Sequence, residues 1–441
     1  MMDELDPLTF DRKLREACRA WSRWRRQLRA AEAFDDEPLL AYRRLSSQQA
    51  FQELTDLGDR DPLAPYLRRW VYRLAEQRIN AQALASVEAE RRANLLVIEE
   101  PAHTRCSLAE MFRRALGDSA RREGWLHSFL TNSRTLAAGT ALLWERRAEI
   151  ARRMGLPDAD SIESCCPELT SAAQALLEST DDMAEAFKTR ELSELLSHAL
   201  GHDLDEGWPG RLSVRSLTDL FAETPLFQGL SLDTGAFPAA LAGSSFLRGF
   251  ARLGSAWVRA TAPAQQPFVV ACDPYGLRER SVGALLASVA CSPVFARRVC
   301  GLSGARLQTR TRATARVALL HVRGTALNVL LRRAALEGRS SLNRAFEAQV
   351  ERVYGLGLPA DVAGSVFRLR VDAPARFAGT LLAAKQHAEF VDAHDEDWYR
   401  NPRAVDQLRS EAELSPQINC SKADLESGTR ALRSALLERL G

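Results

Sequence analysis

The sequence predicts an all-α protein with at most a few short strands. Arginine, alanine and leucine are abundant among its 441 residues, and all three favour helices. Long segments repeat their apolar residues every three to four positions, the period of a helix face that packs against a core. Short apolar runs that suit strands occur at 95–98 (LLVI) and 268–271 (FVVA).

The N-terminal half reads as a series of helices. The segment 9–31 places an apolar stripe on one face, and arginines fill most of its other faces, which is typical of a core-docked helix with a solvated basic side. A loop or hinge is expected at 155–167, which combines Gly, Pro, Asp and Ser. Further helices are expected over 39–92, in pieces broken at 58–62, and over 107–116, 125–153 and 170–200.

A turn at 207–212 divides the chain into an N-terminal helical region, residues 1–210, and a helical core, residues 211–441. The helix expected over 306–333 carries many arginines, which we interpret as a solvated face paired with acidic residues. Other helices of this half are expected over 245–261, 278–290, 343–354, 375–391, 403–414 and 422–440.

Composition narrows the function classes. The net charge of +2 gives no bulk attraction to nucleic acid or membrane, and no run of about 18 apolar residues is present to span a bilayer. The N-terminus is acidic and does not resemble a signal peptide. The eight cysteines have no CxxC spacing, so we expect reduced thiols in a cytoplasmic protein. The pair Cys165-Cys166 allows a redox or metal site, but a loop without that role is favoured.

One pair of histidines has the spacing of a zinc-binding helix. His198 and His202 lie four residues apart, and Asp203 follows them. However, Ala199 stands where a metallopeptidase needs a glutamate, and Gly201 is typical of a helix end that would turn His202 away. We favour a capped helix end, with a metal site at these residues as the alternative.

The helix expected over 245–261 organises the second half. Its apolar face repeats at Phe246, Phe250, Leu253 and Trp257. Inside it lies the window 251–255, Ala-Arg-Leu-Gly-Ser, where a zinc hydrolase would carry His-Glu-x-Gly-His.

From about residue 213 onward, the order of segments resembles the thimet-oligopeptidase and oligoendopeptidase family of zinc peptidases. The segment 247–257 resembles the family's His-Glu-x-x-His helix, and 281–293 resembles the helix that supplies a glutamate as third zinc ligand. The arginine-rich segment 306–333 follows, and 397–402 (DWYRNP) is similar to a C-terminal signature of the family. The resemblance implies a zincin-like helical architecture with a central channel or cleft that takes peptides.

The same resemblance implies that the catalytic groups are lost. It places the zinc histidines on Ala251 and Ser255, the general base on Arg252, and the third ligand on Ser281, with Glu279 the nearest carboxylate. Alanine has no donor atom, a serine hydroxyl is a poor zinc ligand, and a guanidinium cannot accept a proton at pH 7. The segment 372–380 also lacks the tyrosine expected there. We therefore expect no zinc or other cofactor.

These observations predict a catalytically dead zinc-peptidase-like protein that binds a peptide or protein. Arg252, Trp257 and Glu279 are candidate cleft residues, and Arg252 is expected to hold a peptide carboxylate or to pair with Glu279. One alternative is a metallohydrolase with its metal displaced to His198 and His202. Another is a nucleic-acid-binding protein that uses the arginine-rich faces. Partners in a membrane are not expected, and the oligomeric state stays open.

Overall fold

The computed structural model describes residues 7–30, 38–94, 96–99, 104–107, 119–188, 224–228, 244–263, 265–364, 369–414 and 420–441. Helices make up most of these residues. The strands within them are β1 (Leu96–Glu99) and β2 (Thr104–Ser107), which pair antiparallel with Leu96 opposite Ser107. The predicted fold class, all-α with at most a few short strands, is confirmed.

The helices of the first half follow the predicted order closely. The break expected at 58–62 and the long helix expected at 125–153 are both present, and the helix expected at 107–116 lies, after Ser107 at the end of β2, outside the described residues. The helical elements of this half are α1 (Pro7–Ala30), η1 (Leu40–Tyr42), η2 (Arg44–Ser46), α2 (Gln48–Leu57), η3 (Gly58–Arg60), α3 (Ala64–Ile79), α4 (Ala81–Asn94), α6 (Ser119–Arg153), α7 (Asp160–Glu163), α8 (Leu169–Ser179) and α9 (Asp181–Glu185).

The second half is helical almost throughout its described residues. The expected helix at 422–440 has these bounds in the structure, and the others agree to within a few residues. Its elements are α12 (Ser244–Thr261), α13 (Phe268–Ala271), α14 (Leu277–Ala290), α15 (Pro293–Arg298), α16 (Gly304–Glu337), α17 (Arg339–Tyr354), η4 (Ala360–Val362), α18 (Ala373–His394), η5 (Trp398–Arg400), α19 (Pro402–Leu414) and α20 (Lys422–Leu440).

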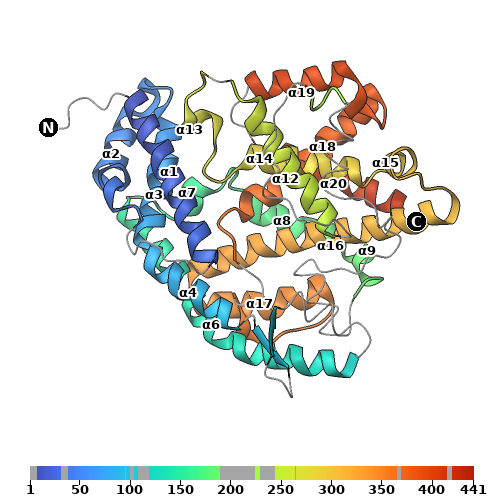
Figure 1. Cartoon of the computed structure of the whole chain (residues 1–441), viewed down its shortest axis with the longest axis horizontal. Helices are drawn as coiled ribbons and strands as arrows, with labels where there is room; N and C mark the ends of the chain where they lie inside the picture. Colours follow the sequence, from blue (N-terminus) through green and yellow to red (C-terminus); the bar gives the residue numbers. More distant parts are fainter. Residues whose placement is uncertain are drawn as a thin grey trace.

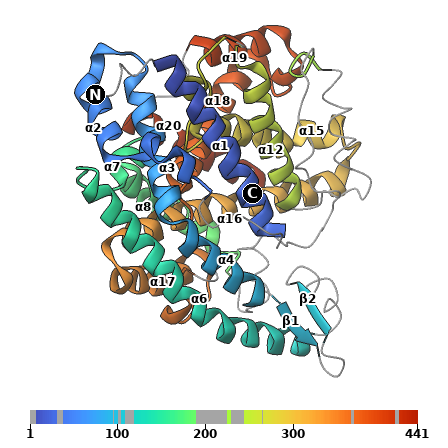
Figure 2. The same cartoon turned by 60° about the vertical axis from the view of Figure 1, so that its left-hand side comes forward.

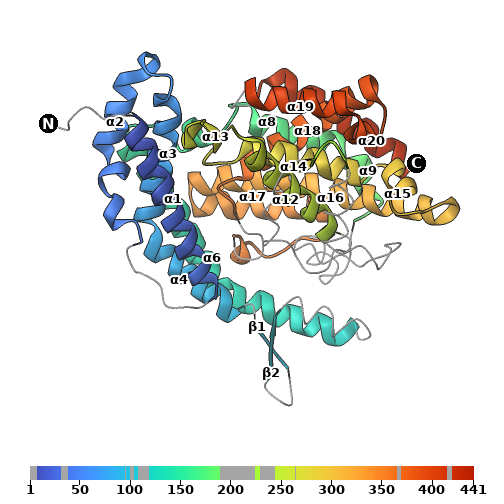
Figure 3. The same cartoon turned by 45° about the horizontal axis from the view of Figure 1, so that its top comes forward.

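Helix α16 is the central element of the body. It runs across the middle of the molecule and contacts α8, α17, α18 and α20 (Figure 1). Helices α1, α2 and α3 lie together at one end, α15 lies at the opposite end, and α12, α14 and α18 lie between them (Figure 1). Helices α4 and α6 form an arm that carries the β1–β2 pair away from the body (Figures 2 and 3). No helix in the described part of the chain is long and apolar enough to cross a membrane.

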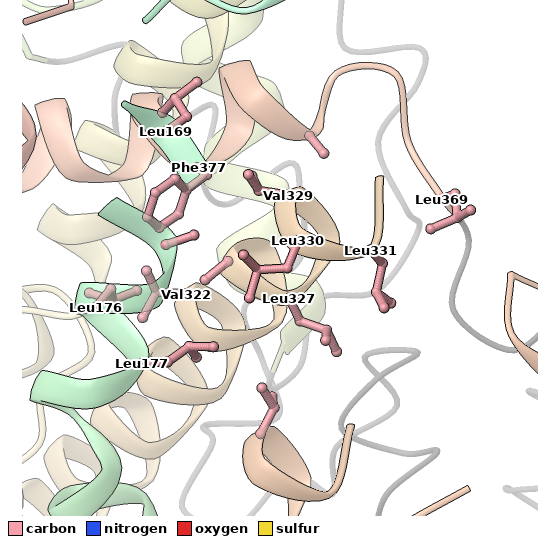
Figure 4. Close-up of a cluster of buried hydrophobic side chains, with 14 of the residues drawn as sticks. Leu169, Leu176, Leu177, Val322, Leu327, Val329, Leu330, Leu331, Leu369 and Phe377 are labelled. Carbon is pink, nitrogen blue, oxygen red and sulfur yellow. The ribbon is translucent and has the colours of Figure 1, made fainter. Parts of the chain in front are cut away.

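One hydrophobic cluster joins the two halves of the sequence around α16. Leu176 and Leu177 of α8 lie beside Val322 and Leu330 of α16, with Phe377 of α18 nearby (Figure 4). Residues on both sides of position 210 therefore share a core. The boundary predicted there lies outside the described residues, so the division into 1–210 and 211–441 stays a prediction.

The apolar run 268–271 is a short helix, α13, and the prediction of a strand is wrong. The Asp11 carboxylate of α1 accepts the backbone N–H groups of Phe268 and Val269, at 2.9 and 2.8 Å. These donors lack partners inside a helix, so a carboxylate in this position stabilises the first turn. Because the cap comes from a residue far away in the sequence, local propensity could not reveal it.

The loop expected at 155–167 contains α7 and carries part of a buried ion network. The side chain of Glu163 is fully buried and pairs with Arg147 of α6 and with Arg332 of α16. Nη2 of Arg332 lies 2.5 Å from Oε2 of Glu163. Arg147 Nη1 also lies 2.5 Å from Oε1 of Glu76 in α3. Burial alone would lower the pKa of Arg147, but Glu163 and Glu76 together raise it. Three helices and the predicted loop are thus connected by buried charges.

The arginines of α16 are not all on a solvated face, which corrects the prediction for the helix 306–333. Arg323 and Arg332 are 0% and 1% exposed. Arg323 donates to Asp181 Oδ1 at 2.9 Å and to Thr180 Oγ1 at 2.8 Å. These side chains bind α8, α9 and the predicted loop to α16 through internal contacts.

A buried histidine gives the fold a pH dependence. His387 of α18 is 9% exposed, and its Nδ1 accepts the indole N–H of Trp398 at 3.2 Å. Burial and the charge of Arg439 lower the pKa of His387 from 6.5 to about 4. Between these two pKa values the unfolded chain therefore binds more protons than the folded chain. The contribution of neutral His387 to the free energy of unfolding is complete above pH 6.5 and is lost as the pH falls toward 4.

We expect the free energy of unfolding to fall by about 2 kcal/mol between pH 7 and pH 5 on account of His387. Urea unfolding at both pH values measures this change. The variant His387→Gln is expected to lose most of the difference, whereas His394→Gln, which removes a half-buried imidazole from the same helix, is expected to keep it. Equal pH slopes in the wild type and in His387→Gln would contradict the assignment.

Candidate functional site

Helices α12 and α14 cross with their backbones in contact. A Cβ atom added to Gly254 would lie 2.5 Å from Gly283 Cα, and one added to Gly283 would lie 2.5 Å from the carbonyl oxygen of Ala251. Real side chains do not approach backbone atoms this closely, so the crossing requires glycine at both positions. The window 251–255 singled out in the sequence therefore faces α14.

Ser255 connects the two helices at this crossing. Its hydroxyl lies 3.1 Å from the carbonyl oxygen of Ala251 and 3.2 Å from that of Glu279, both of which accept its proton. Ala251, Ser255 and Glu279 are thus brought together. Ser281, the position matched to the third ligand, lies against α18 instead, because Gly379 packs on its backbone nitrogen.

These residues do not fit the zinc ion that the resemblance implies. Ala251 offers no donor, and the Ser255 hydroxyl proton is already shared between backbone carbonyls. Within the described ranges, no three or more His, Cys, Asp or Glu side chains are grouped to hold a metal ion. His198, His202 and Asp203, the alternative metal site, lie outside the described residues.

Two of the candidate cleft residues, Trp257 and Arg252, differ in their exposure. Trp257 is fully buried, and its indole N–H donates to the carbonyl oxygen of Leu226 at 2.7 Å, so it is a core residue. Arg252 is exposed on α12. The guanidiniums of Arg280 and Arg259 lower the pKa of Glu279. The carboxylate-binding role of Arg252 stays a prediction.

Buried polar atoms without a hydrogen-bond partner concentrate between residues 273 and 280. Such atoms are rare in folded proteins, and each needs a water, an ion or a ligand to satisfy it. Asp273 Oδ1 lies 3.2 Å from Arg69 Nη1, a contact of charges without hydrogen-bond geometry. The atoms in this short segment are Asp273 Oδ1, the Tyr275 hydroxyl, both terminal nitrogens of Arg278, Glu279 Oε2 and Arg280 Nε.

Arg278 and Glu279 are the central members of this segment. Arg278 is 5% exposed, and burial lowers the pKa of its guanidinium, an effect opposed by Glu279. Burial also raises the pKa of Glu279, and Asp273 raises it further. A buried guanidinium and a buried carboxyl, each with atoms left unsatisfied, form a polar site at the start of α14. Sequence reasoning missed Arg278, since an arginine in a first helical turn is ordinarily solvated.

Three of the four segments that carry the family resemblance lie together. Leu253 and Trp257 of α12, Leu285 of α14, and Trp398 and Tyr399 of the DWYRNP segment belong to one hydrophobic cluster. Trp398 and Tyr399 are 0% and 1% exposed. The sharpest part of the resemblance is therefore a packing feature beside the α12–α14 crossing.

The adjacent thiols Cys165 and Cys166 do not have the properties of a reactive pair. Both are free, and Cys166 Sγ donates to Glu168 Oε2 at 2.7 Å. Burial and this hydrogen bond raise the pKa of Cys166 to about 12. The thiol is therefore protonated at neutral pH, which disfavours thiolate chemistry.

Comparison with known proteins finds similarity to solved structures only at a low level of identity. No protein-family model and no curated protein matches the sequence. Among solved structures, the chain is similar to that of Pyrococcus furiosus carboxypeptidase, with 12% sequence identity, a TM-score of 0.44 and coverage of 100% of both chains. At this distance, nothing about the site is transferred from that protein.

Proposed function

We propose that the chain is a catalytically inactive zinc-peptidase-like protein that binds a peptide or protein at the start of α14. The observation that carries the proposal is the group of unsatisfied buried polar atoms at residues 273–280, next to the α12–α14 crossing. A ligand backbone has alternating donors and acceptors that can satisfy such groups. Binding without a cofactor, in the cytoplasm, is part of this proposal.

The two central side chains offer complementary contacts. The terminal nitrogens of Arg278 can donate to a ligand carbonyl or carboxylate, and Oε2 of Glu279 can accept an N–H. Hydrogen bonds with a charged partner contribute more than neutral ones, and removing one partner leaves the other unsatisfied. Both side chains are therefore expected to matter for affinity.

Peptide hydrolysis is not part of the proposal. The Ser255 hydroxyl contacts the backbone carbonyl oxygen of Glu279 and not its carboxylate, and the positions matched to the metal ligands and base hold Ala251, Ser255 and Arg252. These residues supply neither a metal-bound water nor a general base. The chain is expected to hold a ligand at this site without cleaving it.

The test combines metal content, hydrolysis and binding. We expect protein purified without chelators to contain substoichiometric zinc, and to leave a set of defined short peptides uncleaved, because the ligand positions lack donors. Stoichiometric zinc that is lost in His198→Ala would instead identify the displaced metallohydrolase. Zinc is measured by atomic emission, and cleavage by mass spectrometry.

Binding of the same peptides is measured by calorimetry. Arg278→Met and Glu279→Gln are expected to weaken it by about tenfold each, since each removes a charged hydrogen-bonding group. Arg153→Gln, which removes an arginine that is 70% exposed on α6, serves as the control and is expected to bind as the wild type does. Equal affinity in all variants, or no peptide binding at all, would refute the proposed function.

A further inference from the structure

Three arginines converge on one carboxylate where α14 meets α18. Asp372, directly before α18, accepts Arg280 Nη2 and Arg376 Nε at Oδ2, both at 2.8 Å. Arg370 donates through Nε to Oδ1 at 2.8 Å and through Nη2 to Oδ2 at 3.3 Å. We call these three side chains the arginine cluster.

The charges in this cluster do not balance. Three guanidiniums surround the Asp372 carboxylate. The Glu279 carboxylate also interacts with Arg280, so at least one positive charge stays in excess. Burial would raise the pKa of Asp372, but Arg376, Arg370 and Arg280 hold it far below its usual range. Burial, Arg280 and Arg370 lower the pKa of Arg376 to about 10, in spite of its bond to Asp372. The three guanidiniums therefore repel one another, and a further anion beside them would stabilise the arginine cluster.

The cluster is open to solvent and has donors to spare. The side chains of Arg280, Arg370 and Arg376 are 34%, 40% and 28% exposed. Each guanidinium has five N–H donors, and Asp372 uses at most two of them on any one arginine. Arg280 Nε is in addition buried without a hydrogen-bond partner. An incoming anion can thus reach unused donors on several guanidiniums at once.

The place of the cluster in the fold adds to its positive potential. Helix α18 spans 22 residues, and its N-terminus begins at Ala373, directly after Asp372. The partial positive charge at a helix N-terminus favours nearby anions. Arg280 also follows Glu279 in α14, and Gly379 of α18 packs on the backbone of Arg280 and Ser281. The cluster therefore borders the polar site at the start of α14.

We propose that Arg280, Arg370 and Arg376 form a binding site for an oxyanion group, a carboxylate or a phosphate, of a ligand. Guanidinium groups match the planar geometry of both oxyanions. The Asp372 carboxylate already occupies part of the donors in the same manner. This site stands on its own charges and contacts, and it does not depend on peptide binding at residues 273–280.

The first arm of the test uses inorganic phosphate as the probe, titrated by calorimetry into the full-length chain at low ionic strength. Saturable binding is expected, weakening with added salt. Arg370→Gln and Arg376→Gln are expected to weaken binding about tenfold each. Arg153→Gln, on the distant helix α6, is the control and is expected to leave binding unchanged.

A variant that is expected to strengthen phosphate binding distinguishes an anion-binding site from a cluster that only stabilises the fold. Asp372→Asn removes the carboxylate that competes for the same guanidiniums, so it is expected to tighten phosphate binding at least about threefold. Circular dichroism establishes that each variant is folded. Arg370 is the most exposed of the three arginines, which makes Arg370→Gln the variant that perturbs the core least.

A second arm distinguishes the source of the oxyanion. A short peptide with a free C-terminus is compared with the same peptide amidated, beside phosphoserine and serine. Binding that requires the free carboxylate identifies a peptide end, and binding that requires the phosphate identifies a phosphorylated ligand. Affinities that are unchanged in folded Arg370→Gln and Arg376→Gln, or weaker binding in folded Asp372→Asn, or no binding of either anion, would overturn the proposal.

Discussion

Replacing Glu163 with leucine is expected to lower the free energy of unfolding by about 3 to 5 kcal/mol. The side chain of Glu163 is fully buried and pairs with both Arg147 and Arg332, whose side chains alone are 4% and 2% exposed. Removing it leaves two buried guanidiniums with fewer counter-charges. Both arginines also lie over the ring of Trp144, at 4.9 and 5.9 Å from its centroid, so they cannot turn to solvent without disturbing the core.

Urea unfolding of the variant measures this cost. The matched control is Glu149→Leu on α6, which removes an exposed carboxylate paired with Arg153 and is expected to cost about 0.5 kcal/mol or less. Adding Arg147→Met to Glu163→Leu is expected to restore part of the loss, because the uncompensated charge is removed with its partner. A cost below about 1 kcal/mol for Glu163→Leu alone would show that these charges are solvated.

The positions of the helices could be predicted from the sequence because their apolar periodicity is local. The helix expected at 422–440 is observed with these bounds, and the helix expected at 9–31 is α1, Pro7–Ala30. The short helix α13 could not be predicted, because its cap comes from Asp11 in α1. A four-residue apolar run carries too little periodicity to decide between helix and strand.

Part of the candidate site could be predicted from the sequence. The sequence singled out the window 251–255 and named Glu279 as the nearest carboxylate, and the structure places this window against α14. The burial of Arg278 and Arg332 could not be predicted from the sequence. Arginine side chains are mostly exposed, and these two are buried only because helices distant in the sequence pack over them. The convergence of Arg280, Arg370 and Arg376 on Asp372 likewise depends on how α14 and α18 meet.

Replacing Gly283 with alanine is expected to destabilise the protein by about 3 kcal/mol, although alanine is the better helix former. The added Cβ would lie 2.5 Å from the carbonyl oxygen of Ala251, with the Cα of Ala251 at 3.1 Å. Both are backbone atoms of α12, so the clash is relieved only if the two helices move apart. Such a movement also separates Ser255 from the carbonyl oxygen of Glu279, now 3.2 Å from its hydroxyl.

The matched control is Gly139→Ala, a glycine inside helix α6 whose added Cβ would meet the side-chain methyl Cγ2 of Val87 at 3.0 Å. A side-chain tip can rotate away, so this change is expected to alter stability by about 1 kcal/mol or less. Thermal and urea unfolding compare the two variants. Equal stability of Gly283→Ala and Gly139→Ala would contradict a backbone contact at the crossing. Ala251 and Ser255 would then face a gap between α12 and α14. In that case only the lack of suitable donor atoms, and not the close contact of the helices, would argue against zinc at this position.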